Sequence, residues 1–305
     1  MKAIARPNPN KVRMQPYAPS TLAEQLSRTS TPYRDPVAKI RWEQLSTEQF
    51  WLPPEAVSLD TVPAFMALPI ESRRRLSQYE FLNFIEAGLW LEGIFMERIT
   101  RSMRSHRGSR TVLKYRLHEL REEAGHSLMF LELMERSGLS IPYNHRPRFH
   151  LADIFGRRAP MESLGFWMAI LIGEEVPDRL NRYLRSHASD VCPTILEMST
   201  SHVIDEARHI AYARETVEER MAQLHPLSRL FLKPLLRKLV RQFVDVFYYP
   251  KPALYELAGL APGADWARAA RANPARAAFV DLCLNPTLQL LRNRGFEIGW
   301  PKPKT

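Results

Sequence analysis

Three residues between positions 202 and 209 could hold a metal ion from one face of a helix. His202, Glu206 and His209 form the pattern H-x-x-x-E-x-x-H. At 3.6 residues per turn, two histidines seven positions apart lie nearly above one another, with the glutamate on the same face. The rest of that face is apolar, so a carboxylate there needs a compensating charge. A divalent cation is the usual compensation for a cluster of glutamate and histidine.

A second pair, Glu123 and His126, repeats the E-x-x-H spacing on another predicted helix. One such pattern alone is equally consistent with an accident of a polar helix. The second copy favours a metal site, because helical bundles build di-iron or di-manganese sites from two E-x-x-H helices and two further glutamates. We therefore expect one further glutamate from each of two other helices.

The two remaining glutamates can be sought on the helices predicted at 71–103 and 161–187. On the first, Glu92 lies within an apolar stripe, whereas Glu86 lies six positions away, about 120° round the helix. We therefore choose Glu92. On the second, the apolar row favours Glu175 over its neighbour Glu174 without settling the choice.

With a histidine four residues before the second E-x-x-H, this set resembles the p-aminobenzoate N-oxygenase (AurF-type) family of ferritin-like di-iron oxygenases. The resemblance covers roughly residues 45–250, and the 27-residue interval from Glu175 to His202 matches the family's spacing and decides against Glu174. It implies seven residues that are both metal ligands and catalytic, namely Glu92, Glu123, His126, Glu175, His202, Glu206 and His209.

The resemblance also implies a reaction. Two iron ions would activate O2 as a co-substrate with electrons from an external donor. The substrate would be a primary amine: an aryl amine, an amino acid or a carrier-bound aminoacyl group. The product would be a hydroxylamine, with nitroso or nitro compounds as further stages, in secondary metabolism. A ferritin-like desaturase or C–H hydroxylase is the alternative, and a non-catalytic metal-binding protein is a weaker one.

The acids just before the two E-x-x-H glutamates, Glu122 and Asp205, are expected to support the site. The resemblance implies that each hydrogen-bonds the histidine of the opposite helix, which would fix the imidazole tautomer. The alternative is that both face solvent beside arginines such as Arg208. Arg208, Arg98 and Arg101 are also candidates for anchoring a substrate carboxylate, with surface solvation as the alternative for each.

Composition favours one large helical domain. The chain has 305 residues, of which 45% are hydrophobic, with 24 prolines and 12 glycines. The longest apolar run, 165–173, is too short to span a bilayer, and the first residues lack the apolar core of a secretory signal. We therefore expect a cytoplasmic protein. Cys192 and Cys283 form no disulfide framework.

We predict an all-α, ferritin-like helical bundle over residues 46–250. Residues 1–45 are basic and punctuated by proline, so we expect an extended or partly disordered arm. Residues 251–305 are expected to form helices that pack on the bundle. Further bundle helices are expected at about 110–137, 193–223 and 226–248.

A formal net charge of +10 bears on possible partners. The basic residues are either solvated helix faces or sites for an anionic partner, such as an acidic carrier protein or a carboxylate substrate. Nucleic acid is disfavoured because no nucleic-acid-binding motif accompanies the charge. The chain encodes no redox partner domain, so a separate reductase is expected. We also expect a homodimer.

Overall fold

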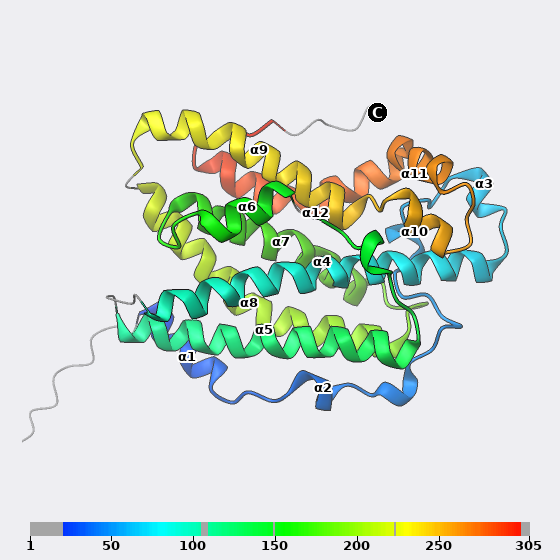
Figure 1. Ribbon diagram of the computed structural model, residues 1–305, viewed down its shortest axis with the longest axis horizontal. Coiled ribbons are helices and arrows are strands. Elements are labelled where there is room, and N and C mark those ends of the chain that lie inside the picture. The colour runs from blue at the N-terminus through cyan, green and yellow to red at the C-terminus, as the bar shows by residue number, and fades with distance from the viewer. Residues whose placement is uncertain (1–20, 105–108, 149, 223, 300–305) are drawn as a thin grey trace, which may run out of the picture.

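Four long helices lie side by side at the centre of the molecule (Figure 1). The computed structural model describes residues 21–104, 109–148, 150–222 and 224–299. The central helices are α4 (Ile70–Arg104), α5 (Arg110–Ser137), α7 (Leu164–Ser186) and α8 (Pro193–Ala222). Their bounds agree with the predicted ranges to within a few residues. The predicted all-α, ferritin-like bundle is confirmed, and the β-pairing among the described residues is one isolated bridge between Phe50 and Val191.

Local sequence signals set the ends of these helices. The side chain of Ser109 accepts a hydrogen bond from the backbone N–H of Thr111, and Ser163 does the same for Phe166. Such caps satisfy N–H groups that the first turn of a helix leaves without a partner. Gly138 ends α5 in the left-handed conformation, with φ 66°, which glycine adopts without steric cost.

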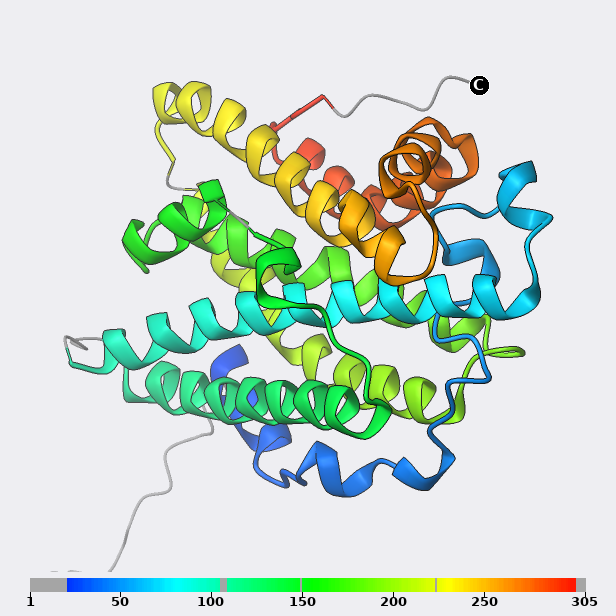
Figure 2. The same ribbon diagram turned by 45° about the vertical axis from the view of Figure 1, so that its right-hand side comes forward.

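Outer helices cover α7 from several sides (Figure 2). Helix α6 (His150–Arg158) packs on α4 and α7, and α9 (Pro226–Tyr248) also packs on both. Helix α12 (Pro274–Asn293) packs on α7. As a result, every residue of α7 from Phe166 to Asp178, except Ala169, is buried. No helix in the described part of the chain is both long and apolar enough to cross a bilayer.

The remaining elements join the bundle at its edges. They are η2 (Pro54–Ala56), α3 (Pro63–Met66), η3 (Tyr143–His145), α10 (Pro252–Leu257) and α11 (Gly263–Ala272). Arg276 of α12 is buried and donates hydrogen bonds to the backbone carbonyls of Ala56 and Tyr248. The C-terminal helices therefore pack on the rest of the chain through buried polar contacts as well as apolar ones. Cys192 and Cys283 are both buried and free.

The N-terminal arm differs from the expectation. Residues 1–20 lie outside the described residues, but from residue 22 the arm forms α1 (Leu22–Ser30), α2 (Pro36–Lys39) and η1 (Trp42–Gln44). Helices α1 and α2 pack on α5. Gly125 of α5 permits this, because a Cβ there would overlap the hydroxyl of Tyr33 and lie 3.0 Å from the ring of Pro36. The proline spacing suggested an extended segment, but packing on the bundle orders it.

Candidate metal centre

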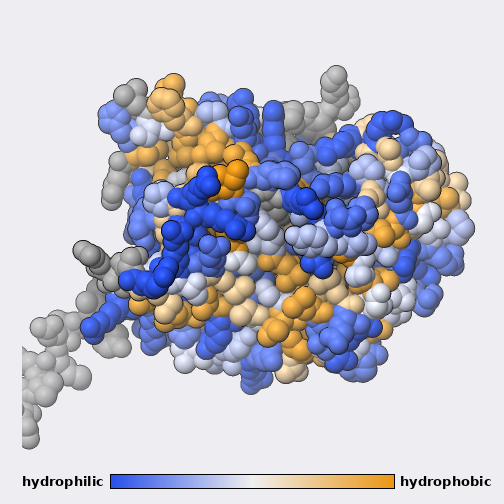
Figure 3. Space-filling model, in the orientation of Figure 1, coloured by the Kyte–Doolittle hydropathy of each residue, from blue (hydrophilic) through white to orange (hydrophobic). Residues whose placement is uncertain are grey.

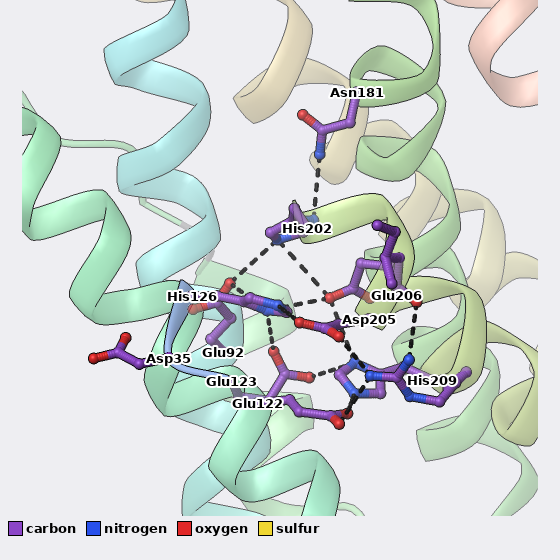
Figure 4. Close-up of polar contacts among 12 residues, drawn as sticks. Asp35, Glu92, Glu122, Glu123, His126, Asn181, His202, Asp205, Glu206 and His209 are labelled. Carbon is purple, nitrogen blue, oxygen red and sulfur yellow. Dashed lines mark hydrogen bonds and ion pairs between the residues drawn. The ribbon is translucent and has the colours of Figure 1, made fainter. Parts of the chain in front are cut away.

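Six of the seven predicted ligands meet inside the bundle (Figure 4). Helix α8 supplies three of them, α5 supplies two and α4 supplies Glu92. Each side chain is buried; for example, Glu123 and His126 are 0% exposed and Glu206 is 1% exposed. The six residues are Glu92, Glu123, His126, His202, Glu206 and His209.

One set of donors gathers around Glu92, His126 and His202. Each offers one ligand atom, and these atoms all lie within 4.8 Å of one another. Nε2 of His202 is 3.5 Å from Oε1 of Glu92, and Nδ1 of His126 is 3.9 Å from the same oxygen. The hydroxyl of Ser127 donates a 2.7 Å hydrogen bond to Oε2 of Glu92, which leaves Oε1 directed at the two imidazoles. Two neutral nitrogens and one carboxylate oxygen thus face a common point.

The second set lies around Glu123, Glu206 and His209. Nδ1 of His209 is 3.1 Å from Oε1 of Glu123 and 3.4 Å from Oε1 of Glu206. The other oxygen of Glu123 is 3.3 Å from Nδ1 of His126. Glu123, Glu206 and His126 themselves meet the same 4.8 Å condition. Glu123 therefore presents one oxygen to each set of donors.

Helix α7 contributes Glu174, and the choice of Glu175 is corrected. Oε2 of Glu175 accepts a 2.9 Å hydrogen bond from Thr287, and its Oε1 pairs with Arg214 and Arg179, so its carboxylate is fully engaged away from the cluster. Burial, and then the carboxylate of Glu206, raise the pKa of Glu174 well above its ordinary value. Oε1 of Glu174 is buried without a hydrogen-bond partner. Glu174 is the glutamate of α7 that lies beside Glu206.

The reason for the error is that α7 is buried all round. Periodicity distinguishes two neighbouring residues only on a helix with one buried face, whereas α8 covers one side of α7 and α9 and α12 cover others. Glu174 and Glu175 are both buried, 5% and 1% exposed, and only their partners distinguish them. The family spacing that selected Glu175 points one position beyond the glutamate that lies beside Glu206.

Hydrogen bonds behind the cluster orient two of the histidines. Nε2 of His126 donates to Oδ2 of Asp205 at 3.3 Å, and Nε2 of His209 donates to Oε2 of Glu122 at 2.9 Å. These are the two contacts expected from the sequence. Each leaves Nδ1 of the imidazole facing the cluster. Arg208 joins the two acids, since it donates to both Glu122 and Asp205. It is therefore not free to anchor a substrate.

Two supporting residues escaped the sequence argument. Ser127 holds Glu92, as described above, and the amide of Asn181 contacts Nδ1 of His202 at 3.3 Å. Asn181 is seven positions after Glu174, which puts both on one face of α7. Had Glu174 been chosen, this spacing would have pointed to Asn181.

The donor set fits two divalent cations. Four carboxylates and three neutral imidazoles carry four negative charges, the amount that two divalent ions compensate. Several of the donor atoms are buried and lack a hydrogen-bond partner, which is costly unless a ligand satisfies them. These atoms are Oε1 of Glu123, both carboxylate oxygens of Glu206, Nδ1 of His209 and Oε1 of Glu174.

The titration of the histidines reflects the same excess of negative charge. Burial alone would lower the pKa of His126, but its hydrogen bonds to Asp205 and Glu123 raise it well above its ordinary value. Burial would likewise lower the pKa of His209, but the carboxylates of Glu123 and Glu206 raise it. Metal ions bound here would supply positive charge to the same carboxylates.

Comparison with known families decides the classification. The family model described as p-aminobenzoate N-oxygenase AurF matches residues 17–295. The chain belongs to the AurF family. The match extends beyond the range of about 45–250 over which the sequence alone shows the resemblance, and it includes the described N-terminal helices and all the described C-terminal helices. As an AurF-family protein, the chain is a non-haem dimetal oxygenase.

Relatives of this AurF-family protein include two mycobacterial sequences, Uncharacterized protein Mb0909 of Mycobacterium bovis and Uncharacterized protein Rv0885 of Mycobacterium tuberculosis. Each is 24% identical to it over 243 residues, which are 78% of this chain and 70% of the relative. Among solved structures, a mutant of R2-like ligand-binding oxidase with an aerobically reconstituted Mn/Fe cofactor is 13% identical, with a TM-score of 0.41. That likeness covers 91% of this chain and 87% of the oxidase.

Proposed function

We propose that the protein is an O2-dependent di-iron N-oxygenase. It converts a primary amine to a hydroxylamine and then to nitroso or nitro products, in secondary metabolism. The substrate class is an aryl amine, an amino acid or a carrier-bound aminoacyl group. The observation that supports this most is the position of His202, whose Nε2 lies 3.5 Å from Oε1 of Glu92. A third imidazole adds a donor to the site without adding negative charge.

The two irons would be held by different residues. Glu92, His126 and His202 would hold one ion, and Glu174 and His209 would hold the other. Glu123 and Glu206 lie between these two sets and would contribute to both sites. When bound, the ions would bind and activate O2 with electrons from a separate reductase.

The protein's own contribution is orientation and exclusion of water. Asp205 and Glu122 accept the Nε2 protons of His126 and His209 and so keep each Nδ1 available as a donor atom. The donors are at most 9% exposed, so water competes little for the oxidant or for the amine. Arg208 pairs with Glu122 and Asp205, so its charge is not available to a substrate amine that enters this space.

Product analysis with isotopically labelled oxygen tests the proposal. The iron-loaded protein is reduced chemically, exposed to ¹⁸O2, and offered aryl amines, amino acids, carrier-bound aminoacyl groups and aliphatic chains of similar size. We expect ¹⁸O on nitrogen for at least one amine, and none with the Glu206→Ala variant. Oxidation of an aliphatic carbon with no N-oxygenated product would instead identify a desaturase or C–H hydroxylase. Two bound metals with no oxidation at all would identify a metal-binding protein.

A further inference from the structure

A cavity of about 1330 Å³ opens at the end of the bundle where α4 ends and α5 begins. It lies at the left of Figure 1, and strongly hydrophilic residues gather near this end in Figure 3. Segments far apart in the sequence line it, including the start of α1 and the last turns of α8. Six arginines are among the lining residues: Arg98, Arg101, Arg116, Arg157, Arg158 and Arg220.

Arg98 is a buried charge without a counter-ion in the described part of the chain. It is 7% exposed, and it donates hydrogen bonds to the backbone carbonyls of Arg157 and Ala159 rather than to a carboxylate. Its Nε is buried and has no hydrogen-bond partner. A buried guanidinium is costly unless an anion compensates it. The wall of the cavity therefore lacks an anion.

Arg116 of α5 is a second buried arginine whose charge is only partly compensated. It is 3% exposed, its Nη1 lies 3.3 Å from Glu162, and its Nε has no partner. Glu162 is also paired with Arg220, so one carboxylate is shared by two arginines. At the rim, Arg101 and Arg158 are exposed and form no ion pair within the described residues. Among the described lining residues, four glutamates face six arginines, and one of the arginines, Arg157, also pairs with Asp153.

We propose that this cavity binds the phosphate group of an organic ligand. A phosphate carries about −1.5 to −2 charge at pH 7 and three strong acceptor oxygens, so it can engage several arginines at once, whereas a carboxylate has one charge and two oxygens. Arginine also binds phosphate oxygens through two parallel N–H groups. Leu22, Val112 and Met161 provide an apolar part of the wall for the ligand's organic body.

The cavity lies close to the metal centre along the helices. Tyr212 lines the cavity and follows the ligand His209 by three positions. The centre of its ring lies 4.8 Å from that of Tyr115 and 5.4 Å from that of Trp167, so Tyr212 is held against these buried aromatics. Arg116 precedes Glu123 by seven positions, a rise of roughly 10 Å. A phosphate in the cavity would thus lie about two helical turns from the metals.

This placement makes the phosphate a part of the substrate, an inference that rests on the proposed N-oxygenase function. The amine would be carried by a free phosphorylated compound, because a phosphate monoester offers three acceptor oxygens, whereas the phosphodiester of a carrier protein's arm has one negative charge and two free oxygens, as a carboxylate has.

Calorimetry with two matched ligands tests the binding step without turnover. Phenyl phosphate and benzoate share an aromatic ring and differ in the acid. At fixed ionic strength, we expect the metal-loaded protein to bind phenyl phosphate at one site per chain and benzoate at least about tenfold more weakly. The double variant Arg101→Gln, Arg158→Gln should lose about tenfold or more in affinity for phenyl phosphate. No saturable binding, or equal binding of benzoate, would overturn the inference.

A control variant separates the cavity from general charge. Arg104→Gln with Arg110→Gln removes the same charge from exposed positions that do not line the cavity, so affinity should stay within about twofold of the parent protein. An equal loss in both double variants would count against a defined site.

Substrate comparison identifies the source of the phosphate, and binding and oxidation are measured separately so that failure of one proposal is distinguished from failure of the other. An aminoalkyl phosphate is compared, as oxidation substrate, with the same amine on a carrier's phosphodiester arm; we expect the phosphate monoester to be preferred, and a preference for the carrier-bound amine would overturn the inference. Phosphate binding without oxidation of any amine would overturn the N-oxygenase proposal and leave the cavity's ligand class standing. Amine oxidation without phosphate binding would overturn the phosphate site and leave the N-oxygenase proposal standing.

Discussion

Nε2 of His209 lies 2.9 Å from Oε2 of Glu122, and the other oxygen of that carboxylate accepts a 2.8 Å hydrogen bond from Arg208. Because Arg208 also donates to Asp205, which accepts from His126, one arginine links the acids behind two of the three histidines. The orientation of the metal-facing nitrogens thus depends on residues that do not themselves face the cluster.

The first prediction concerns this support. Glu122→Ala should weaken metal binding by about 10- to 100-fold, because His209 loses the acceptor that fixes its tautomer. Competition with a chelator of known affinity measures the change. Glu132→Ala, which removes an exposed partner of Arg136 on the same helix, is the control and should leave affinity unchanged. Equal affinity in both variants would show that Glu122 has no positioning role.

The second prediction distinguishes the two glutamates of α7. Glu174→Ala should reduce the metal content from two ions per chain towards one, because Glu174 lies beside Glu206. Glu175→Ala should keep two ions but lower the free energy of unfolding by about 1–3 kcal/mol, since Thr287 and Arg214 lose a buried partner. Metal analysis and denaturant unfolding provide the two measurements. The reverse pattern would restore Glu175 as the ligand.

The third prediction concerns α4. Glu92→Ala should abolish one metal site, because its Oε1 faces both His126 and His202. Glu86→Ala should leave the metal content near two, since that carboxylate pairs with Arg146 at 3.2 Å instead. Arg146 is 46% exposed, so water can solvate its charge once the partner is gone. Metal analysis after loading and desalting measures both variants. Loss of metal in Glu86→Ala would require a different register for the site.

The fourth prediction tests how the N-terminal arm is held. Gly125→Ala should lower the free energy of unfolding by about 1–3 kcal/mol, because the new methyl group would overlap Tyr33 and displace the arm from α5. Gly93→Ala is the matched control, because nothing lies within 4 Å of its added Cβ. It should stabilise the helix by up to about 1 kcal/mol. Chemical denaturation of both variants gives the comparison, and equal effects would mean that the arm does not depend on this contact.

The sequence by itself determined the helices and most of the metal site. Spacings of three, four and seven residues put His202, Glu206 and His209 on one face, because helix geometry is local and regular. The family resemblance, rather than helical spacing, indicated that the acids Glu122 and Asp205 support the opposite histidines. Caps such as Ser109 and Gly138 lie at the observed helix ends, since they act on neighbouring backbone groups.

Only the tertiary structure decided what depends on neighbours from distant segments. Glu174 and Glu175 are both buried, and the choice between them follows from Arg214 of α8 and Thr287 of α12, which no spacing on α7 encodes. The arm containing Tyr33 is ordered because it packs at Gly125, although its own composition predicts little structure. The positive charge around Arg98 and Arg116 likewise gathers only where the ends of several helices meet. Each basic residue taken alone is typical of a solvated helix face.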